Sequence, residues 1–311
     1  MTEPCNPINT LLLVTVRVHS WLFLMSTENE QLPLYRVRAR NTSADSENKI
    51  HDDTVAASYG FRGGLVPGVT VYGYMTVPIV ARFRHDWLER GSMQVKFHQP
   101  FYEGEGVEVL AEVDDGSEPL KITVIARRED GTVCATGLAT VNDSSRWLGE
   151  PRLEDYPLAD LPAYEARPPA SRETCIPGKT LGTLKERVDL RDAESGFLQR
   201  LDEQLDLYYG GSGVAHPAML LAMANHSLMH NFELGPWIHT SSDLINLSVA
   251  RDGEEISVRG SVEDCYERKG HEFVVLNLLF VAKGERVVQQ VRHTAIYRPR
   301  VKSELQENAH S

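Results

Sequence analysis

The sequence has few cysteines and no excess of positive charge. Its four cysteines, Cys5, Cys134, Cys175 and Cys265, lie far apart and form no CxxC pair, which argues against a disulfide framework or structural zinc and favours a reducing cytoplasm. No ligand cluster, GxGxxG or P-loop pattern occurs, so we expect no metal and no cofactor. The net charge of −12 argues against nucleic-acid binding, but a local basic rim can still hold an anionic coenzyme.

The chain also lacks a hydrophobic run of membrane-spanning length. Its most apolar stretch, residues 10–25, is interrupted by Arg17 and His19 and has neither a preceding basic residue nor a small-residue cleavage site. It is shorter than a spanning helix. A polar, start-like MSTENEQ begins at Met25. We therefore expect no membrane association and interpret residues 1–24 as a disordered or upstream extension, with secretion as the alternative.

What the chain does have is an internal repeat. The passage YGFRGGLVPGVTVYGYM begins at Tyr59 and YGGSGVAHPAMLLAMAN begins at Tyr209, and each has a proline eight residues after its tyrosine. Each passage continues as a segment that is apolar on every side, over 69–83 and 218–229. This pattern indicates a helix that is buried on all sides rather than a surface helix with one solvent-exposed face.

Similar strand patterns follow both helices. Two extended runs come first, then a hairpin that turns at Asp130-Gly131 in one copy and at Lys283-Gly284 in the other. The expected extended runs lie within 92–113 and 242–262, and the hairpins lie at 121–141 and 272–297. Apolar and polar residues alternate over 107–113 and 256–262. This alternation predicts one buried and one solvent-exposed face for each strand, with Ser257 and Arg259 on the solvent-exposed face.

Each half therefore reads as an antiparallel sheet wrapped around one buried helix, an α+β fold. We expect the two halves to pack as a pseudo-dimer, with their sheets joined edge to edge and their helices side by side. Residues 143–178 are rich in proline and charge and are interpreted as a long linker. The predicted organisation is an N-terminal half at 25–142, this linker, a C-terminal half at 179–300 and a tail at 301–311.

One segment adds a specific resemblance. Residues 47–68, ENKIHDDTVAASYGFRGGLVPG, resemble the signature of MaoC-like, R-specific enoyl-CoA hydratases, which reads Asp-x-Asn-x-x-His-x-Asp and ends at a glycine that opens the buried helix. The positions in register are Asn48, His51, Asp53, Ala57, Gly60, Phe61 and Gly68. The resemblance implies a double hotdog fold over roughly residues 33–299. The family's catalytic aspartate is replaced by Ser46, and its second histidine by Pro67.

The resemblance implies a site in the first half. His51, with Asn48, would take the proton of water, and the backbone N–H of Gly68 would stabilise the enolate oxygen. The acid partner is left open: Ser46 occupies its position, and Asp45 and Glu47 flank it. Further residues assigned to substrate binding are Asp53, Phe61, Val66 and Tyr72. Alternative interpretations make Asp53 a helix N-cap, Asn48 a turn residue and His51 an ordinary loop histidine.

The second half lacks this motif, because its corresponding positions, 198–204, contain no Asn or His. His239 could line the cleft between the halves, although its surroundings favour a structural histidine. The predicted function is reversible water addition to a 2-enoyl thioester of coenzyme A or a carrier protein, by a homodimer of double hotdog chains. One alternative is a thioesterase that uses Asp45, Glu47 or Asp52. The other is a non-catalytic thioester-binding protein or partner subunit.

Overall fold

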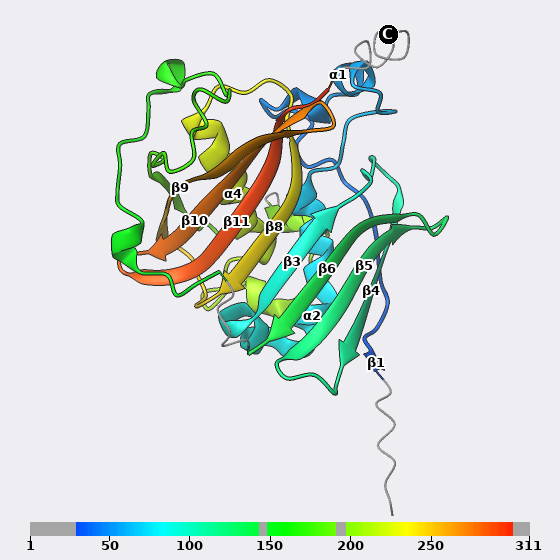
Figure 1. Ribbon diagram of the computed structural model, residues 1–311. Coiled ribbons are helices and arrows are strands. Elements are labelled where there is room, and N and C mark those ends of the chain that lie inside the picture. Colours follow the sequence, from blue (N-terminus) through cyan, green and yellow to red (C-terminus); the bar gives the residue numbers. More distant parts are fainter. Residues whose placement is uncertain (1–28, 143–147, 191–196, 301–311) are drawn as a thin grey trace, which may run out of the picture.

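The computed structural model describes residues 29–142, 148–190 and 197–300. The expectations for residues 1–24 and 301–311 fall outside these ranges. The described strands form one 11-stranded sheet in the order β1-β4-β5-β6-β3-β8-β11-β10-β9-β7, with β2 paired to β4 (Figure 1). The strands are β1 (Glu30–Gln31), β2 (Tyr35–Arg38), β3 (Ser92–Phe97), β4 (Gly106–Asp114), β5 (Leu120–Arg128), β6 (Val133–Val141), β7 (Leu184–Arg187), β8 (Ile238–Asn246), β9 (Glu255–Arg268), β10 (His271–Ala282) and β11 (Arg286–Arg298).

The two helices predicted to be buried all round are confirmed. They are α2 (Gly68–Arg90) and α4 (Pro217–Asn231), and most of their residues are buried. In α2 the backbone leaves helical geometry at Arg84, one residue after the end of the fully apolar segment. The shorter helices are α1 (Asp53–Ser58), α3 (Phe197–Leu201), η1 (Lys49–His51), η2 (Leu153–Asp155), η3 (Tyr164–Ala166) and η5 (Asp206–Tyr208). None of the helices in the described ranges is long and apolar enough to cross a membrane.

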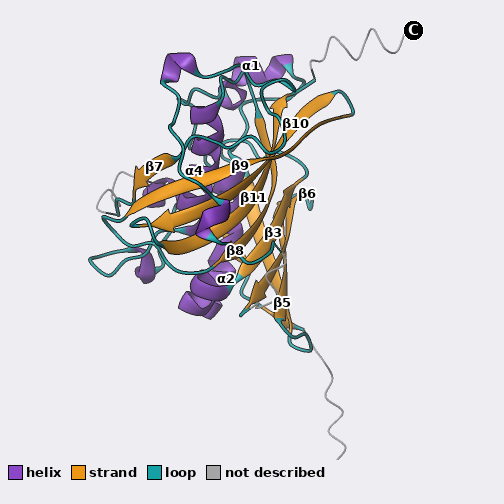
Figure 2. Ribbon diagram, turned by 60° about the vertical axis from the view of Figure 1, so that its left-hand side comes forward, coloured by secondary structure: helices purple, strands orange, loops and turns teal. Residues whose placement is uncertain are grey.

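The predicted pseudo-dimer arrangement is also confirmed. Strand β3 of the first half pairs antiparallel with β8 of the second, with Val95 opposite Ser242. The two long helices contact each other on the same side of the curved sheet (Figure 2). This pairing removes one exposed strand edge from each half, because the backbone groups of β3 and β8 satisfy one another. It also brings the loop before α2 next to the beginning of β8, where the candidate site lies.

The alternation of buried and wet positions is confirmed in β4, where Val107, Val109, Ala111 and Val113 are buried. In β9 the prediction is wrong for two residues, because Ser257 and Arg259 are only 5% and 7% exposed. The Arg259 guanidinium donates to the hydroxyl of Ser257 at 3.2 Å and to the carbonyl of Gly284 at 3.1 Å, so both side chains lie against the sheet instead of extending into water.

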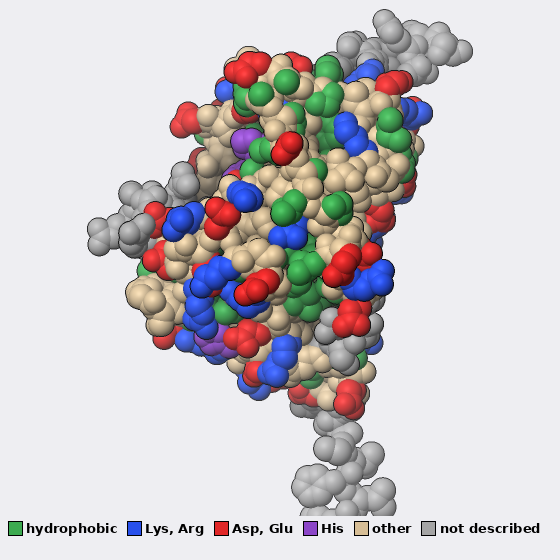
Figure 3. All heavy atoms as spheres, turned by 90° about the vertical axis from the view of Figure 1, so that its left-hand side faces the viewer, with side chains coloured by type: hydrophobic (Ala, Val, Ile, Leu, Met, Phe, Trp, Pro, Cys, Tyr) green, Lys and Arg blue, Asp and Glu red, His purple; other side chains and the backbone are tan. Residues whose placement is uncertain are grey.

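The linker packs against the outer face of the second half. Tyr156 is buried in a small cluster with Leu279 and Val281. Its hydroxyl donates to Asn277 Oδ1 at 2.9 Å and accepts from Gln290 Nε2 at 3.1 Å. Around Tyr156 the linker is therefore packed on β10 and β11. Charged side chains of both signs are interspersed on the neighbouring surface (Figure 3).

Candidate functional site

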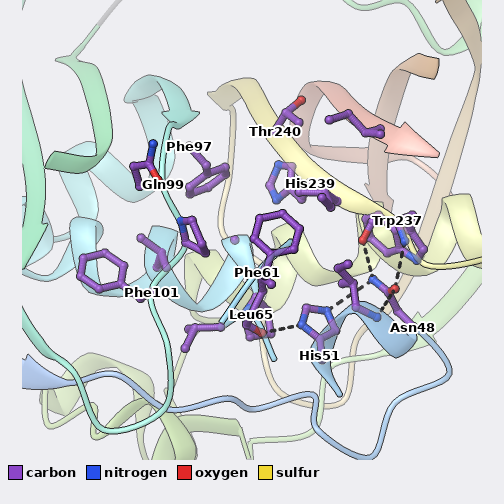
Figure 4. Close-up of a pocket in the computed structure, with 18 of the residues that line it drawn as sticks. Asn48, His51, Phe61, Leu65, Phe97, Gln99, Phe101, Trp237, His239 and Thr240 are labelled. Carbon is purple, nitrogen blue, oxygen red and sulfur yellow. Dashed lines mark hydrogen bonds between the residues drawn. The ribbon is translucent and has the colours of Figure 1, made fainter. Parts of the chain in front are cut away.

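A pocket of about 200 Å³ lies between the two halves. Its walls come from the loop before α2, the first turn of α2, the end of β3, helix α4 and the beginning of β8 (Figure 4). Most of the lining side chains are apolar or aromatic, as is usual for small-molecule sites. The lining residues are Asn48, Ile50, His51, Phe61, Leu65, Val66, Pro67, Gly68, Val71, Phe97, His98, Gln99, Pro100, Phe101, Asn225, Trp237, Ile238, His239, Thr240 and Ile296.

His51 ends the short helix η1 and lines this pocket. Its Nδ1 lies 2.6 Å from the carbonyl oxygen of Leu65. Because a carbonyl only accepts, Nδ1 carries the proton and Nε2 keeps its lone pair. Burial lowers the pKa of His51, and the hydrogen bond to Leu65 offsets only part of that effect. The imidazole is therefore neutral near pH 7 and offers a proton acceptor at Nε2.

Asn48 connects the His51 loop to the second half. It caps η1 by accepting from the N–H of Ile50 at 3.3 Å. The same side chain donates to the carbonyl of Trp237 at 2.9 Å and accepts from the Trp237 N–H at 3.1 Å. Its Nδ2 also lies 3.4 Å from Nε2 of His51. Asn48 therefore fixes the turn, as its alternative interpretation proposed, and also fixes His51 relative to β8 (Figure 4).

Three neighbouring residues hold the backbone around His51. Asn41 Nδ2 donates to the carbonyl of His51 at 2.8 Å, and Asp53 Oδ1 accepts from the N–H of Gly64 at 2.7 Å. A Cβ at Gly64 would lie 2.1 Å from the His51 carbonyl oxygen, so only glycine permits this approach.

Helix α1 is capped by Asp52, whose carboxylate accepts from the N–H of Val55 at 2.9 Å. The expectation that Asp53 is the N-cap is therefore wrong.

The N-terminus of α2 opens into the pocket at Gly68. The preceding Pro67 provides no side-chain cap, and the first N–H groups of a helix have no intrahelical acceptor. The partial positive charge of the helix end adds to these donors. A Cβ at Gly68 would lie 2.9 Å from Nδ1 of His239 and 3.1 Å from Cε2 of Phe97. A larger residue would therefore collide with His239 and Phe97, so glycine permits these two rings to pack against the helix end.

The acidic candidates lie outside the pocket lining. Asp45 is exposed and Ser46 is half-buried, with the Ser46 hydroxyl 3.4 Å from the Asn48 carbonyl. Glu47 accepts from the hydroxyl of Tyr164 at 2.7 Å and from Arg167 at 3.1 Å. Burial opposes ionisation of Glu47, but these two hydrogen bonds outweigh it and lower its pKa. The linker thus holds the Glu47 carboxylate away from His51.

The four residues assigned to substrate binding divide into two pairs. Phe61 and Val66 line the pocket. Asp53 lies outside its lining and accepts from the N–H of Gly64. Tyr72 is fully buried in the core, and its hydroxyl has no hydrogen-bond partner among the described residues.

Two further polar side chains reach the pocket from the second half. His239, at the beginning of β8, and Asn225, on α4, both line it. Nδ1 of His239 and Oδ1 of Asn225 are buried and have no hydrogen-bond partner in the described structure. Sequence reasoning considered His239 but favoured a structural role, and it missed Asn225. The only sequence signal for Asn225 was its place on the second copy of the buried helix, near the cleft between the halves.

Within the described ranges, no group of three or more His, Cys, Asp or Glu side chains is arranged to hold a metal ion.

Comparison with known proteins finds similar structures but no matching sequence family. No protein-family profile and no curated protein matches the sequence. Among solved structures, a protein described as a MaoC domain dehydratase from Chloroflexus aurantiacus is similar over 88% of this chain and 95% of its own, with a TM-score of 0.62 and 8% identity. A conserved hypothetical protein from Mycobacterium tuberculosis, described as having a double hotdog fold, is similar over 86% and 96%, with a TM-score of 0.59 and 14% identity.

A third structure, described as a MaoC-like dehydratase, is similar over 85% of this chain and 97% of its own, with a TM-score of 0.55 and 12% identity. At these identities the similarity establishes the fold. The chain is an α+β protein with the double hotdog fold, and this is the fold of the MaoC-like dehydratase structures that it resembles. The predicted fold class is confirmed.

Proposed function

We propose that the protein is a hydro-lyase that adds water to, or removes it from, a 2-enoyl thioester of coenzyme A or a carrier protein. The observation that carries this proposal is the shared pocket: the Nε2 lone pair of His51, which lies 3.4 Å from the Asn48 amide nitrogen, and the N-terminus of α2 meet in one apolar cavity. The descriptions of the similar structures as dehydratases support it. Fold alone does not specify the reaction, because one fold hosts several activities.

In the hydration direction, His51 Nε2 takes a proton from water as the water oxygen bonds to C3 of the enoyl group. The π electrons move toward the thioester carbonyl, whose oxygen becomes negative. The N–H groups at Gly68 stabilise that charge. The imidazolium of His51 then returns its proton to C2, the thioester carbonyl re-forms, and the histidine is neutral again. All atoms and protons balance without a carboxylic acid at position 46.

The thioesterase alternative requires a carboxylate that activates water. Of its three candidates, Glu47 is held by Tyr164 and Arg167, and Asp52 caps α1. Asp45 is exposed. Because all three lie outside the pocket lining, we favour water addition over hydrolysis. The homodimer of double hotdog chains stays a prediction, which light scattering of the purified protein would test.

The deciding experiment incubates the protein with crotonyl-CoA and follows loss of enoyl absorbance and release of free thiol separately. We expect enoyl loss without thiol. His51→Ala should lower turnover by about two to four orders of magnitude, the usual effect of removing a general base. His226→Ala is the matched control, because His226 lies on α4 outside the pocket lining and contacts Glu186.

Release of thiol would replace the proposal by a thioesterase. Neither signal, with measurable binding of the thioester, would indicate a binding protein.

A further inference from the structure

His239 approaches the N-terminus of α2 from the opposite half of the molecule. The residue is only 6% exposed, and its ring packs edge-on against Phe97 with 4.8 Å between centroids. Nδ1 faces Gly68 so closely that a Cβ there would be 2.9 Å away. In the view of Figure 4, the ring of Phe61 lies between His239 and His51. The two histidines thus reach the same pocket from different elements.

A buried hydrogen-bond chain extends behind His239. Its Nε2 lies 2.8 Å from the hydroxyl of Ser242, and that hydroxyl lies 2.9 Å from Nδ1 of His293. The two imidazole rings are 4.3 Å apart. Burial lowers the pKa of His293 to about 3. Burial and then the neighbouring His293 hold the pKa of His239 well below its usual value. Both histidines are therefore neutral, and each carries one ring proton.

The Ser242 hydroxyl has one proton, so only two arrangements satisfy this chain. If the hydroxyl donates to His293, then Nε2 of His239 carries the proton and His293 keeps a buried N–H at Nε2, where no protein partner is found among the described residues. If it donates to His239, the unpaired atom of His293 is a lone pair, and Nδ1 of His239 carries a proton facing the pocket. Each arrangement leaves one buried N–H without a partner among the described residues, at Nε2 of His293 in the first and at Nδ1 of His239 in the second. Of these two residues only His239 lines the pocket, so only the second arrangement lets an acceptor atom of a bound ligand pair with that N–H.

We propose that His239 is a second catalytic residue, whose neutral Nδ1–H donates a hydrogen bond to the thioester carbonyl oxygen beside the backbone donor at Gly68. Ser242 and His293 are positioning residues that hold the ring through its Nε2. This inference rests on the proposed use of a thioester substrate and deepens it, because it assigns the second half a part in the site.

The carbonyl oxygen is the group that fits this place. It becomes negative during the reaction, so two converging donors stabilise it more as the reaction proceeds than in the bound substrate. A neutral imidazole suits the task, since it donates without titrating near pH 7. The unpaired Nδ1 also gains a partner when the substrate binds, which removes the cost of leaving a buried polar atom unsatisfied.

The test compares two substitutions of similar size. His239→Leu removes the donor, whereas His239→Asn retains an amide N–H near the position of Nδ1. Losing one oxyanion donor typically lowers kcat by about 10²–10³. We expect that loss for His239→Leu with crotonyl-CoA, little change in KM, and substantial recovery in His239→Asn. His226→Ala again serves as the control, and thermal melting checks that each variant is folded.

Binding provides a second measurement that does not depend on turnover. Butyryl-CoA labelled with ¹³C at the carbonyl has no double bond to hydrate. Its carbonyl stretching frequency should fall on binding to the wild type, and fall less with His239→Leu. Nitrogen-15 NMR should show a protonated Nδ1 at His239, and Ser242→Ala should mix the two tautomers.

The outcomes separate the two proposals. Normal hydration by His239→Leu, or an unchanged carbonyl shift, overturns the role of His239 and leaves the hydro-lyase intact. A shift that depends on His239 without any hydration by the wild type overturns the hydro-lyase and retains the carbonyl contact. No binding of either thioester to the wild type overturns both.

Discussion

Asn48 and Trp237 form a closed pair of hydrogen bonds across the two halves: the Asn48 amide donates to the Trp237 carbonyl at 2.9 Å and accepts from the Trp237 N–H at 3.1 Å. An amide is the only side-chain group that both donates and accepts in this geometry. Because Asn48 also caps the turn that carries His51, this one contact sets the position of His51 relative to His239, two residues beyond Trp237 on the other half.

Replacing the amide by a carboxylate should therefore be costly. Asn48→Asp places a second acceptor against the Trp237 carbonyl at a site that is 5% exposed. We expect a loss of about 2–3 kcal/mol in the free energy of unfolding, from a buried acceptor left without a donor, and a fall in kcat. Asn277→Asp is the control, because Asn277 Oδ1 accepts from Tyr156 and a carboxylate preserves that bond. Equal denaturation midpoints for the two variants would contradict the prediction.

The pH dependence of the reaction follows from the environment of His51. Its folded pKa is lowered by burial from the usual 6.5, and only the neutral ring accepts a proton from water. In the hydration direction, kcat/KM should stay level from about pH 8 down past 6.5 and fall only as the pH drops through the lowered pKa. Initial rates with crotonyl-CoA across this range measure it. A decline beginning above 6.5 would mean that another group titrates.

Much of the fold could be predicted from local patterns. A segment that is apolar on every side has to be enclosed, so α2 and α4 were predicted as the cores of two similar halves, and each turn at Asp130-Gly131 or Lys283-Gly284 closed a hairpin. The burial of Ser257 and Arg259 and the packing of the linker on β10 and β11 were not predicted. Both depend on contacts between segments distant in sequence, which period-two alternation does not describe.

The site was predicted only where it is continuous in sequence. The motif placed Asn48, His51 and Gly68 in one region, and all three line the pocket. His239 belongs to no local pattern, because its relation to Gly68 arises from the pairing of β3 with β8.

By the resemblance alone, Ser46→Asp would restore the family's acid and raise activity. In the structure Ser46 lies outside the pocket lining, beside the Asn48 carbonyl. We therefore expect Ser46→Asp to leave kcat with crotonyl-CoA within about a factor of three, since surface changes away from a site have small effects. A large gain in rate would show that the loop can move a carboxylate into the pocket and that the acid belongs at this position.

The size of the pocket predicts a preference for short acyl groups. Its volume is about 200 Å³, whereas an apolar cavity of about 150 Å³ holds one benzene molecule. We expect kcat/KM to be higher for crotonyl-CoA than for 2-hexadecenoyl-CoA. Val71 lines the cavity from α2, so Val71→Ala should shift the preference toward longer chains. Equal or better turnover of the long substrate by the wild type would contradict this assignment.

The last prediction concerns a buried pair in the second half, at positions corresponding to the motif of the first. Glu203 and His216 are 6% and 0% exposed. Nδ1 of His216 accepts from Ala218 N, so its Nε2 carries the proton that faces Glu203 Oε2 at 3.2 Å. The carboxylate also accepts from the N–H groups of Gln204 and Leu205. Burial alone would raise the pKa of Glu203, but these hydrogen bonds, His216 first, lower it.

A carboxyl whose pKa is lower in the folded state stabilises the fold at pH values above its unfolded pKa, and this contribution disappears as the pH falls through the folded pKa. Glu203→Gln should therefore lower the free energy of unfolding by about 2 kcal/mol at pH 7, and the difference from the wild type should shrink in acid. Glu186→Gln is the control, because its pair with His226 is far more exposed, with 28% and 44% of the two side chains accessible to solvent, and exposed pairs contribute little. Denaturant unfolding at several pH values measures both variants. A difference between Glu203→Gln and the wild type that stays constant down to about pH 3 would mean that Glu203 is not the ionised member of this pair, since an ionised carboxylate has to lose its contribution as it takes up a proton.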